Sequence, residues 1–270
     1  MNFMKKITSK KLAKINRYEI IKLSNKANTP HLASSLSCID IITVIYNDIL
    51  NINSNNLNKL SRDHFILSKG HAATALYVTL KTFKFISKKQ FNSYAKENSY
   101  LEEHPSPKIK GVEAATGSLG HGLPIGCGIA LAKKIKKIKS KVYVLLGDGE
   151  CNEGSVWEAA LFGSAKKLNN LICIVDANKL QGIGKTNEIL SITALGKKFK
   201  SFGWNTIVID GHNHSILKKE LQKNNSKKPK MIIANTIKGK GISFMENDNN
   251  WHYRIPSKEE VLKSKIELKL

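Results

Sequence analysis

The stretch Val142-Tyr143-Val144-Leu145-Leu146-Gly147-Asp148-Gly149 decides the fold of this chain. Its first part, Val142–Leu146, is an unbroken apolar run of strand length, as expected for a strand buried on both faces of a parallel sheet. In open parallel sheets, ligands bind beyond the carboxyl ends of the strands. Asp148, flanked by glycines that allow a close approach of the backbone, is therefore placed to hold a hard cation.

The rest of the chain repeats this alternation of strand and helix patterns. We expect strands at Phe65–Leu67, Val142–Leu146, Leu171–Val175, Thr206–Ile209 and Met231–Asn235, and helices at Lys11–Lys26, Cys38–Leu50, Ala72–Thr82, Leu123–Lys136, Ser155–Lys167, Ala194–Phe202 and Ser215–Lys223. This order predicts an α/β fold, a parallel sheet with helices on both faces. The sequence shows no internal repeat and no domain-sized linker, so we expect residues 1–270 to form a single domain.

Composition excludes several classes of protein. An apolar fraction of 41% over 270 residues can bury a core, which excludes a disordered chain. No stretch approaches the roughly 18 unbroken apolar residues of a membrane span. The basic N-terminus, Met1–Lys14, lacks the apolar region of a signal peptide. The four cysteines lie far apart without a CxxC pair, which argues against a zinc site and a disulfide framework and suits the cytoplasm.

The formal net charge of +23 raises nucleic acid as a partner. However, only three of the 44 cationic side chains are arginines, and specific recognition of phosphates and bases favours the planar guanidinium group. We interpret the lysines as a solvated surface and expect no nucleic-acid partner.

A second strand end completes a candidate cation site. The strand Leu171–Val175 is followed by Asp176-Ala177-Asn178-Lys179-Leu180. Because the two strands are expected to be neighbours, Asp148 and Asn178 should emerge side by side. A carboxylate, an amide oxygen and a main-chain carbonyl suit Mg²⁺, which completes its coordination shell with phosphate oxygens and water. Amide groups of the turn at Gly149, near the start of a helix, would face a diphosphate.

Two other binding motifs fail on spacing. A calcium loop starting at Asp148 needs glycine at its sixth position and glutamate at its twelfth, where this chain has Glu153 and Ala159. Gly184-Lys185-Thr186 suggests a nucleotide P-loop, but the glycine required five residues before Gly184 is replaced by Lys179.

Small residues recur at Gly122, Gly126 and Ala130, every fourth position of one expected helix. Residues with this spacing lie on one face, so they form a smooth ridge that another backbone can approach. Packing on the sheet and contact with another subunit explain this ridge equally well.

Short motifs are spread over nearly the whole chain. They are Ser68-Lys69-Gly70-His71-Ala72, His104-Pro105, Thr116-Gly117-Ser118-Leu119-Gly120, Gly147 to Gly154, Asp176 to Asn178, Lys238-Gly239-Lys240-Gly241, and the segments around His31 and Trp251-His252. Gly147-Asp148-Gly149 with Asn178 downstream resembles the thiamine diphosphate motif. In their order, the motifs together resemble the N-terminal region of transketolase, which implies the thiamine diphosphate-binding fold.

The resemblance implies a role for each matching residue and names the cofactors, thiamine diphosphate and Mg²⁺. The implied metal ligands are Asp148, Asn178 and the carbonyl of Leu180. The implied cofactor-binding residues are His71, Gly117, Leu119, Gly149, Glu153, Asn178 and His252. The implied catalytic residues are His31, His104 and Glu153. In the family the first two hydrogen-bond the substrate, whereas Glu153 and Glu158 match acidic residues at a subunit interface, linked to the partner's catalytic glutamate.

The resemblance also implies a partner. In the family a pyrimidine-binding domain supplies the glutamate that activates the cofactor, and the resemblance here does not extend to such a domain. We therefore expect the N-terminal subunit of a split transketolase, which transfers a two-carbon ketol unit from a ketose to an aldose. Its partner would be a C-terminal transketolase subunit in an α₂β₂ assembly, and its substrates sugars or sugar phosphates.

Two alternatives stay open. The α subunit of a 2-oxo acid dehydrogenase shares the cofactor motif, although the segments around His71, His104 and Thr116–Gly120 favour transketolase. A non-catalytic protein that binds the cofactor or nucleic acid is the other alternative. One departure from the family pattern concerns the site itself, because Tyr253 after His252 replaces a common glycine.

Overall fold

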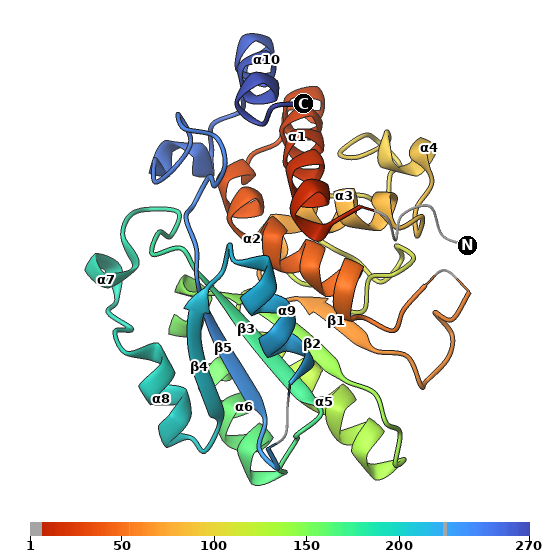
Figure 1. Cartoon of the computed structure of the whole chain (residues 1–270), viewed down its shortest axis with the longest axis vertical. Helices are drawn as coiled ribbons and strands as arrows, with labels where there is room; N and C mark the ends of the chain where they lie inside the picture. The colour runs from red at the N-terminus through yellow and green to blue at the C-terminus, as the bar shows by residue number, and fades with distance from the viewer. Residues whose placement is uncertain (1–6, 54, 224–225) are drawn as a thin grey trace.

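The centre of the molecule is a parallel sheet with the strand order β1-β2-β3-β5-β4 (Figure 1). The computed structural model describes residues 7–53, 55–223 and 226–270, and the sheet has five strands in this part of the chain. They are β1 (His64–Leu67), β2 (Val142–Gly147), β3 (Leu171–Ala177), β4 (Asn205–Asp210) and β5 (Lys230–Asn235). The predicted strands and their parallel pairing are confirmed.

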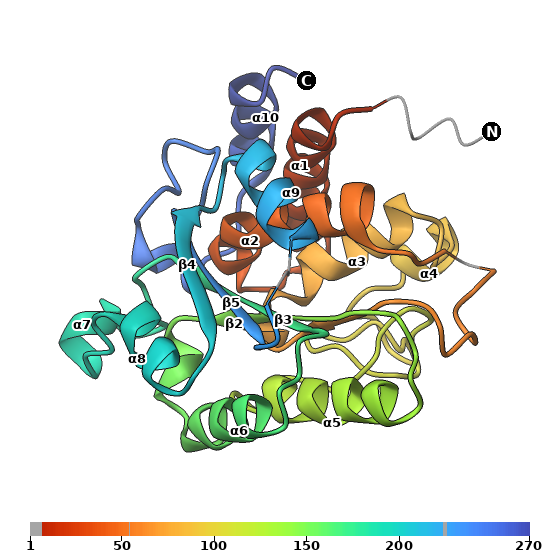
Figure 2. The same ribbon diagram turned by 60° about the horizontal axis from the view of Figure 1, so that its bottom comes forward.

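Helices cover both faces of the sheet, as predicted. Figure 2 shows α5 and α6 on one face and α1, α2, α3 and α9 on the other. The helices are α1 (Ser9–Ala27), α2 (Leu32–Val44), α3 (Ala73–Thr82), α4 (Lys88–Phe91), α5 (Gly122–Ile135), α6 (Gly154–Ala165), α7 (Thr186–Ile189), α8 (Leu195–Ser201), α9 (His214–Gln222) and α10 (Lys258–Glu267). The sequence did not indicate α4, α7 and α10, of which the first two are single turns.

One helix begins earlier than predicted. We expected a helix from Cys38, but α2 begins at Leu32, and every residue of α2 is buried. A helix that is buried all round shows no polar face, so its apolar periodicity does not mark its start. The N-terminal stretch Met1–Lys14 lies partly outside the described residues, and a single domain over residues 1–270 stays a prediction.

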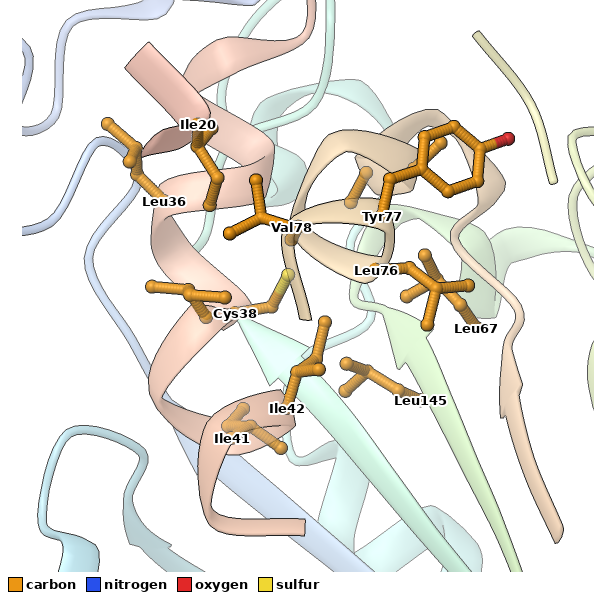
Figure 3. Packing of buried hydrophobic residues seen from close by; sticks show 14 of the residues in the cluster. Ile20, Leu36, Cys38, Ile41, Ile42, Leu67, Leu76, Tyr77, Val78 and Leu145 are labelled. Atoms are coloured by element: carbon orange, nitrogen blue, oxygen red, sulfur yellow. The ribbon is translucent and has the colours of Figure 1, made fainter. Parts of the chain in front are cut away.

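Two apolar layers hold the helices to the sheet. Along β2, Tyr143 and Leu145 face the layer under α1, α2 and α3, whereas Val144 faces the layer under α5 and α6. Figure 3 shows the first layer, in which Leu145 packs near Ile42 of α2. Full burial of each such side chain contributes roughly 1.5–3 kcal/mol. The sheet is therefore fixed from both sides, and its carboxyl edge becomes a rigid platform.

The ridge of small residues on α5 packs against the sheet. A Cβ atom at Gly126 would lie 2.5 Å from Cγ2 of Val144, and one at Gly122 would lie 2.3 Å from Oγ of Ser68. The first of the two interpretations, helix-on-sheet packing, is therefore confirmed. The opposite face of α5 points away from the sheet.

One segment of the described residues, Leu32–Ile49, is long and apolar enough to cross a membrane by length and composition. It comprises α2 and the π-helical turn Ile45–Ile49, and 83% of it is buried inside the fold. Serines and aspartates interrupt its apolar residues. Such burial is typical of a core helix, so this segment is weak support for a membrane span.

Candidate functional site

A cavity of about 360 Å³ lies beyond the carboxyl ends of the central strands. This volume is within the roughly 300–1,000 Å³ typical of ligand pockets. The predicted site residues that line it are His31, His71, His104, Gly117, Leu119, Asp148, Gly149, Asn178, Leu180 and His252. Because Gly147 of β2 pairs with Asp176 of β3, the loops after these strands start side by side.

Four histidines from distant parts of the sequence meet in this cavity. The ring centre of His31 lies 5.0 Å from that of His252, 5.7 Å from that of His71 and 6.3 Å from that of His104. The backbone holds His31 in place, since its N–H donates to the carbonyl of His252 at 2.8 Å. A Cβ atom at Gly117 would lie 2.7 Å from Cδ2 of His104, so only glycine fits beside this ring.

The surroundings keep three of these rings neutral at pH 7. Burial, with smaller contributions from His104 and Lys238, lowers the pKa of His31 to about 4. Burial and then Lys238 lower the pKa of His252 to about 3, and burial holds the pKa of His71 well below its ordinary value. A neutral imidazole has one donor and one acceptor nitrogen, which suits the binding of hydroxyl groups.

We expect these histidines to destabilise the cofactor-free chain in acid. Since the unfolded chain protonates them near pH 6.5 and the folded chain does not, the free energy of unfolding falls as the pH drops below 6.5. After allowance for solvent screening, each costs on the order of 1 kcal/mol at pH 5. Urea denaturation at pH 7 and pH 5 measures this loss for the wild type and for His252→Gln.

The difference between the two proteins isolates one histidine. Burial raises the pKa values of Asp148 and Glu150, so these carboxyls act in the opposite sense in both proteins. His252→Gln should therefore lose less stability than the wild type between pH 7 and pH 5. An equal loss in both proteins would contradict a neutral His252.

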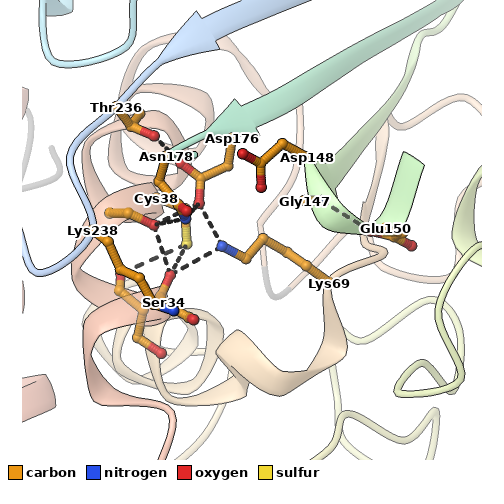
Figure 4. A network of polar contacts seen from close by, with 12 residues as sticks. Ser34, Cys38, Lys69, Gly147, Asp148, Glu150, Asp176, Asn178, Thr236 and Lys238 are labelled. Carbon is orange, nitrogen blue, oxygen red and sulfur yellow. Dashed lines mark hydrogen bonds and ion pairs between the residues drawn. The ribbon is translucent and has the colours of Figure 1, made fainter. Parts of the chain in front are cut away.

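Asp148 and Asn178 lie together at the ends of β2 and β3 (Figure 4). Asp148 accepts hydrogen bonds from the N–H groups of Gly149 at 2.8 Å and of Lys179 at 2.6 Å. Asn178 donates from its amide nitrogen to Oγ of Ser37 at 3.2 Å. The Oδ1 atom of Asn178 accepts from the N–H of Leu180 at 3.1 Å. The predicted juxtaposition of a carboxylate and an amide oxygen is present.

The electrostatics of this pair suit a cation. Burial and then Asp176 raise the pKa of Asp148, whose hydrogen bonds come from backbone N–H groups and the hydroxyl of Thr186. Among the described residues, no cluster of three or more histidines, cysteines or acidic side chains could hold a metal. A metal held here would therefore depend on one carboxylate together with amide and carbonyl oxygens, a set that fits Mg²⁺.

An unpaired donor lies in the same wall. Gln181 lines the cavity, and within the described ranges its Nε2 is buried without a hydrogen-bond partner. A Cβ atom at Gly149 would lie 2.7 Å from Cγ of Gln181, so glycine is needed for this approach. A bound anion would satisfy the donor, which fits a diphosphate.

Beneath Asp148, a second aspartate is paired with a buried lysine. Asp176 accepts from Nζ of Lys69, from Oγ of Ser37 at 2.5 Å and from the hydroxyl of Thr236 (Figure 4). Lys69 also donates to the carbonyl of Ser34 at 3.1 Å and is 1% exposed. This pair fixes the floor of the cavity, and sequence analysis did not single it out.

Glu153 does not line the cavity. It is exposed at the start of α6, as is Glu158 one turn later, so its cofactor-binding and catalytic roles stay predictions. The carboxylate in the cavity wall is Glu150, which accepts from the hydroxyl of Ser68, from the N–H of Gly120 at 3.0 Å and from that of Gly147 at 2.9 Å.

Comparison with protein families identifies this architecture. The model of the transketolase, thiamine diphosphate binding domain family matches residues 8–269. The chain belongs to the transketolase family. The predictions of a thiamine diphosphate-binding fold and of a transketolase-type N-terminal subunit, a transferase, are thereby confirmed. This match favours transketolase over the 2-oxo acid dehydrogenase alternative.

Individual transketolases and transketolase subunits are similar over most or all of this chain. One of the subunits of the apulose-4-phosphate transketolase from Actinobacillus succinogenes is 42% identical over 266 residues, covering 96% of this chain and 95% of that protein. A 6-deoxy-6-sulfo-D-fructose transketolase subunit of a Clostridium species is 36% identical, covering 82% of each chain. A solved transketolase from Campylobacter jejuni superposes with a TM-score of 0.91 and 30% identity over 100% of this chain, which spans 43% of that structure.

The rim of this transketolase cavity carries a distinctive aromatic side chain. Tyr253 lines the cavity and is 61% exposed, with its ring centre 4.7 Å from that of His252 and 6.4 Å from that of His31. A Cβ atom at Gly182 would lie 2.9 Å from the Tyr253 hydroxyl. Tyr253 and Gly182 therefore meet at the mouth of the cavity.

Proposed function

We propose that this chain is the cofactor-binding subunit of a two-component transketolase that moves a two-carbon ketol unit from a ketose to an aldose. The observation that carries the proposal is the gathering of four histidines and the Asp148–Asn178 pair in one cavity. Thiamine diphosphate, when bound, supplies the nucleophilic carbon for this chemistry. The side chains described above would bind and orient the cofactor and the substrate, and they would exclude water from the cavity.

We further propose that Mg²⁺ binds to Asp148, Asn178 and the carbonyl of Leu180. The raised pKa of Asp148 supports this proposal, because the backbone hydrogen bonds and the charge of Lys69 do not offset the burial of this carboxylate, and a bound cation would. The unpaired Nε2 of Gln181 supports an anion nearby. Mg²⁺ commonly joins one or two protein carboxylates to the phosphates of a ligand.

The donor set of the cavity favours hydroxyl groups of the substrate. His31 and His104 offer ring nitrogens, and the low pKa of His31 keeps its ring uncharged at pH 7. Among the described residues that line the cavity, Lys69 is the one lysine or arginine, and it is paired with Asp176. We therefore propose that His31 and His104 bind sugar hydroxyls, while a substrate phosphate, where present, contacts the partner subunit.

The outer face of α5 and α6 supports an assembly with further subunits. In a chain of net charge +23, Gly122–Ala132 and Gly154–Ala165 contain no lysine and no arginine. Leu161 is 61% exposed on this face, near Phe162, and Ile125 is also exposed. An exposed apolar surface of this kind is typical of subunit contacts. Two of the three relatives described above are named as subunits, which supports a partner in an α₂β₂ assembly.

Reconstitution with the partner tests this proposal. We expect the chain alone to bind the cofactor without turning over ketose and aldose, and turnover to appear when a C-terminal transketolase subunit is added. Leu161→Lys should weaken assembly by about 10- to 100-fold, because it replaces an apolar contact worth roughly 1.5–3 kcal/mol. Coupled kinetics and sedimentation measure turnover and assembly.

Leu262→Lys is the matched control, because Leu262 of α10 is 62% exposed and α10 lies on the opposite side of the molecule from α5 and α6 (Figure 2). This variant should assemble like the wild type. Robust turnover by the chain alone would contradict the need for a partner, and equal effects of the two variants would contradict the proposed contact face.

A further inference from the structure

A second buried polar cluster lies outside the cavity, around Asp40 of α2. Its Oδ1 accepts from Arg17 at 3.0 Å and from Nε2 of His214 at 2.9 Å, and its Oδ2 accepts from Arg17 and from Nδ1 of His212 at 2.7 Å. Burial alone would raise the pKa of Asp40, but the Arg17 charge and the two imidazole hydrogen bonds hold it well below its ordinary value. Asp40 is therefore a permanent carboxylate that joins three elements.

Two of its partners reach beyond it to one backbone segment. The N–H of Ile237 donates to Nε2 of His212 at 2.9 Å, and Nε of Arg17 donates to the carbonyl of Lys240 at 2.8 Å. The fit is close, because a Cβ atom at Gly241 would lie 2.9 Å from Cδ of Arg17. The segment after β5 is thus held at two points, one on each side of Lys238.

Lys238 connects this segment to the cavity wall. It is fully buried, and its Nζ donates to the carbonyl of Gln181 at 2.9 Å, to Oδ1 of Asn249 at 2.9 Å and to Nδ1 of His252 at 3.1 Å. Burial and then Lys69 lower the pKa of Lys238 to about 8, so its amine keeps its proton at pH 7. An ammonium group only donates, so His252 accepts at Nδ1 and carries its own proton on Nε2.

We propose that Asp40 is a positioning residue for the cavity. Through Arg17 and His212 it fixes the backbone on both sides of Lys238, and Lys238 then fixes the orientation and the tautomer of His252. His252 thereby presents its Nε2–H to the ligand. This inference rests on the proposed function, because positioning His252 matters for catalysis only if the cavity binds the cofactor. The orientation and the tautomer of His252 can nevertheless be measured in the chain alone.

The tautomers provide a readout that a merely structural role would not move. His212 accepts from the Ile237 N–H at Nε2, so it carries its proton on Nδ1, opposite to His252. Long-range ¹H–¹⁵N spectra of the imidazole rings distinguish the two forms. In the cofactor-free wild type at pH 7, we expect His212 as the Nδ1–H form and His252 as the Nε2–H form.

Variants test the connection between the two clusters. Asp40→Asn replaces one of the two acceptor oxygens by an NH2 group, so it cannot keep the paired contacts with Arg17 together with both imidazoles, and we expect His252 to show a mixture of tautomers. Lys238→Met should give the same change, and the double variant should show no further change, because both act on one contact. Asp48→Asn, which alters an aspartate near the end of the same helical segment, should leave the His252 signals as in the wild type.

A milder variant covers the case in which Asp40→Asn fails to fold. His212→Gln removes the hold on Ile237 and leaves the Arg17–Asp40 pair, and it should shift the His252 signals in the same direction. Unchanged His252 signals in a folded Asp40→Asn or His212→Gln protein would overturn the proposal. Additive changes in the double variant would do the same.

Calorimetry with thiamine diphosphate and Mg²⁺ separates this inference from the proposed function. Asp40→Asn and Lys238→Met should each lower the affinity on the order of tenfold, as is usual when outer hydrogen-bond partners of a site are lost. If the wild type does not bind the cofactor, the proposed function fails, while the tautomer measurement still decides the role of Asp40.

Discussion

Asp148→Ala is expected to lower the affinity for thiamine diphosphate in the presence of Mg²⁺ by about 100-fold or more, or about 3 kcal/mol. Asp148 provides the one carboxylate of the proposed donor set, because Asn178 and Leu180 offer neutral oxygens. Without that charge, too little electrostatic attraction remains to compensate the partial dehydration of the cation, so the cation no longer links the diphosphate to the protein. Titration calorimetry of the full chain with and without Mg²⁺ measures this loss.

Stability and a matched variant make this result interpretable. Removal of Asp148 leaves the N–H groups of Gly149 and Lys179 without their acceptor, so a thermal unfolding curve must show that the variant is folded. Asp48→Ala, remote from the cavity, should bind the cofactor like the wild type. An unchanged affinity in folded Asp148→Ala would remove the metal assignment.

Lys69→Met is expected to have the largest effect on stability, a loss of about 3–5 kcal/mol in the free energy of unfolding. Lys69 and Asp176 are both fully enclosed, and the ammonium group is the charge that compensates the Asp176 carboxylate. Methionine fills similar space but leaves that carboxylate buried and uncompensated, close to Asp148. Urea denaturation at pH 7 measures the loss.

Two further proteins show whether the charge is the cause. Lys89→Met, at an exposed position of α4, should change the stability by no more than about 0.5 kcal/mol. Lys69→Met combined with Asp176→Asn should recover part of the loss, because the buried charge is gone. If Lys69→Met costs no more than Lys89→Met, the pair does not have the role described here.

The fold and the central residues of the site could be predicted from local sequence patterns, namely apolar strands and the polar residues that follow them. An apolar strand followed by Gly147-Asp148-Gly149 places a carboxylate at the carboxyl edge of a parallel sheet, wherever the strand lies in the chain. The same rule places Asn178 at the carboxyl end of the neighbouring strand. The proximity of Asp148 and Asn178 was therefore predictable without knowledge of side-chain contacts. The gathering of the histidines followed from motif order, because His31 and His252 are distant in sequence.

The rest of the site depends on packing that sequence periodicity does not encode. Lys69 and Lys238 belong to two of the quoted motifs, but in a chain rich in lysines the residue type alone does not show that these two are buried. Glu150 and Glu153 lie in one loop, and only the path of the short helical turn Gly149–Asn152 turns the first inward and leaves the second exposed. Asp40 gains its role from contacts with residues of other elements.

The most direct test of the proposed cofactor site is a crystal structure of the chain with thiamine diphosphate and Mg²⁺. We expect a metal ion about 2.1 Å from oxygens of Asp148, Asn178 and the Leu180 carbonyl, with the diphosphate beside Gln181 and the four histidines around the reactive ring. Cofactor bound elsewhere would contradict the proposed site. A structure without a metal ion, in which Asp148 and Asn178 point away from each other, would also contradict it.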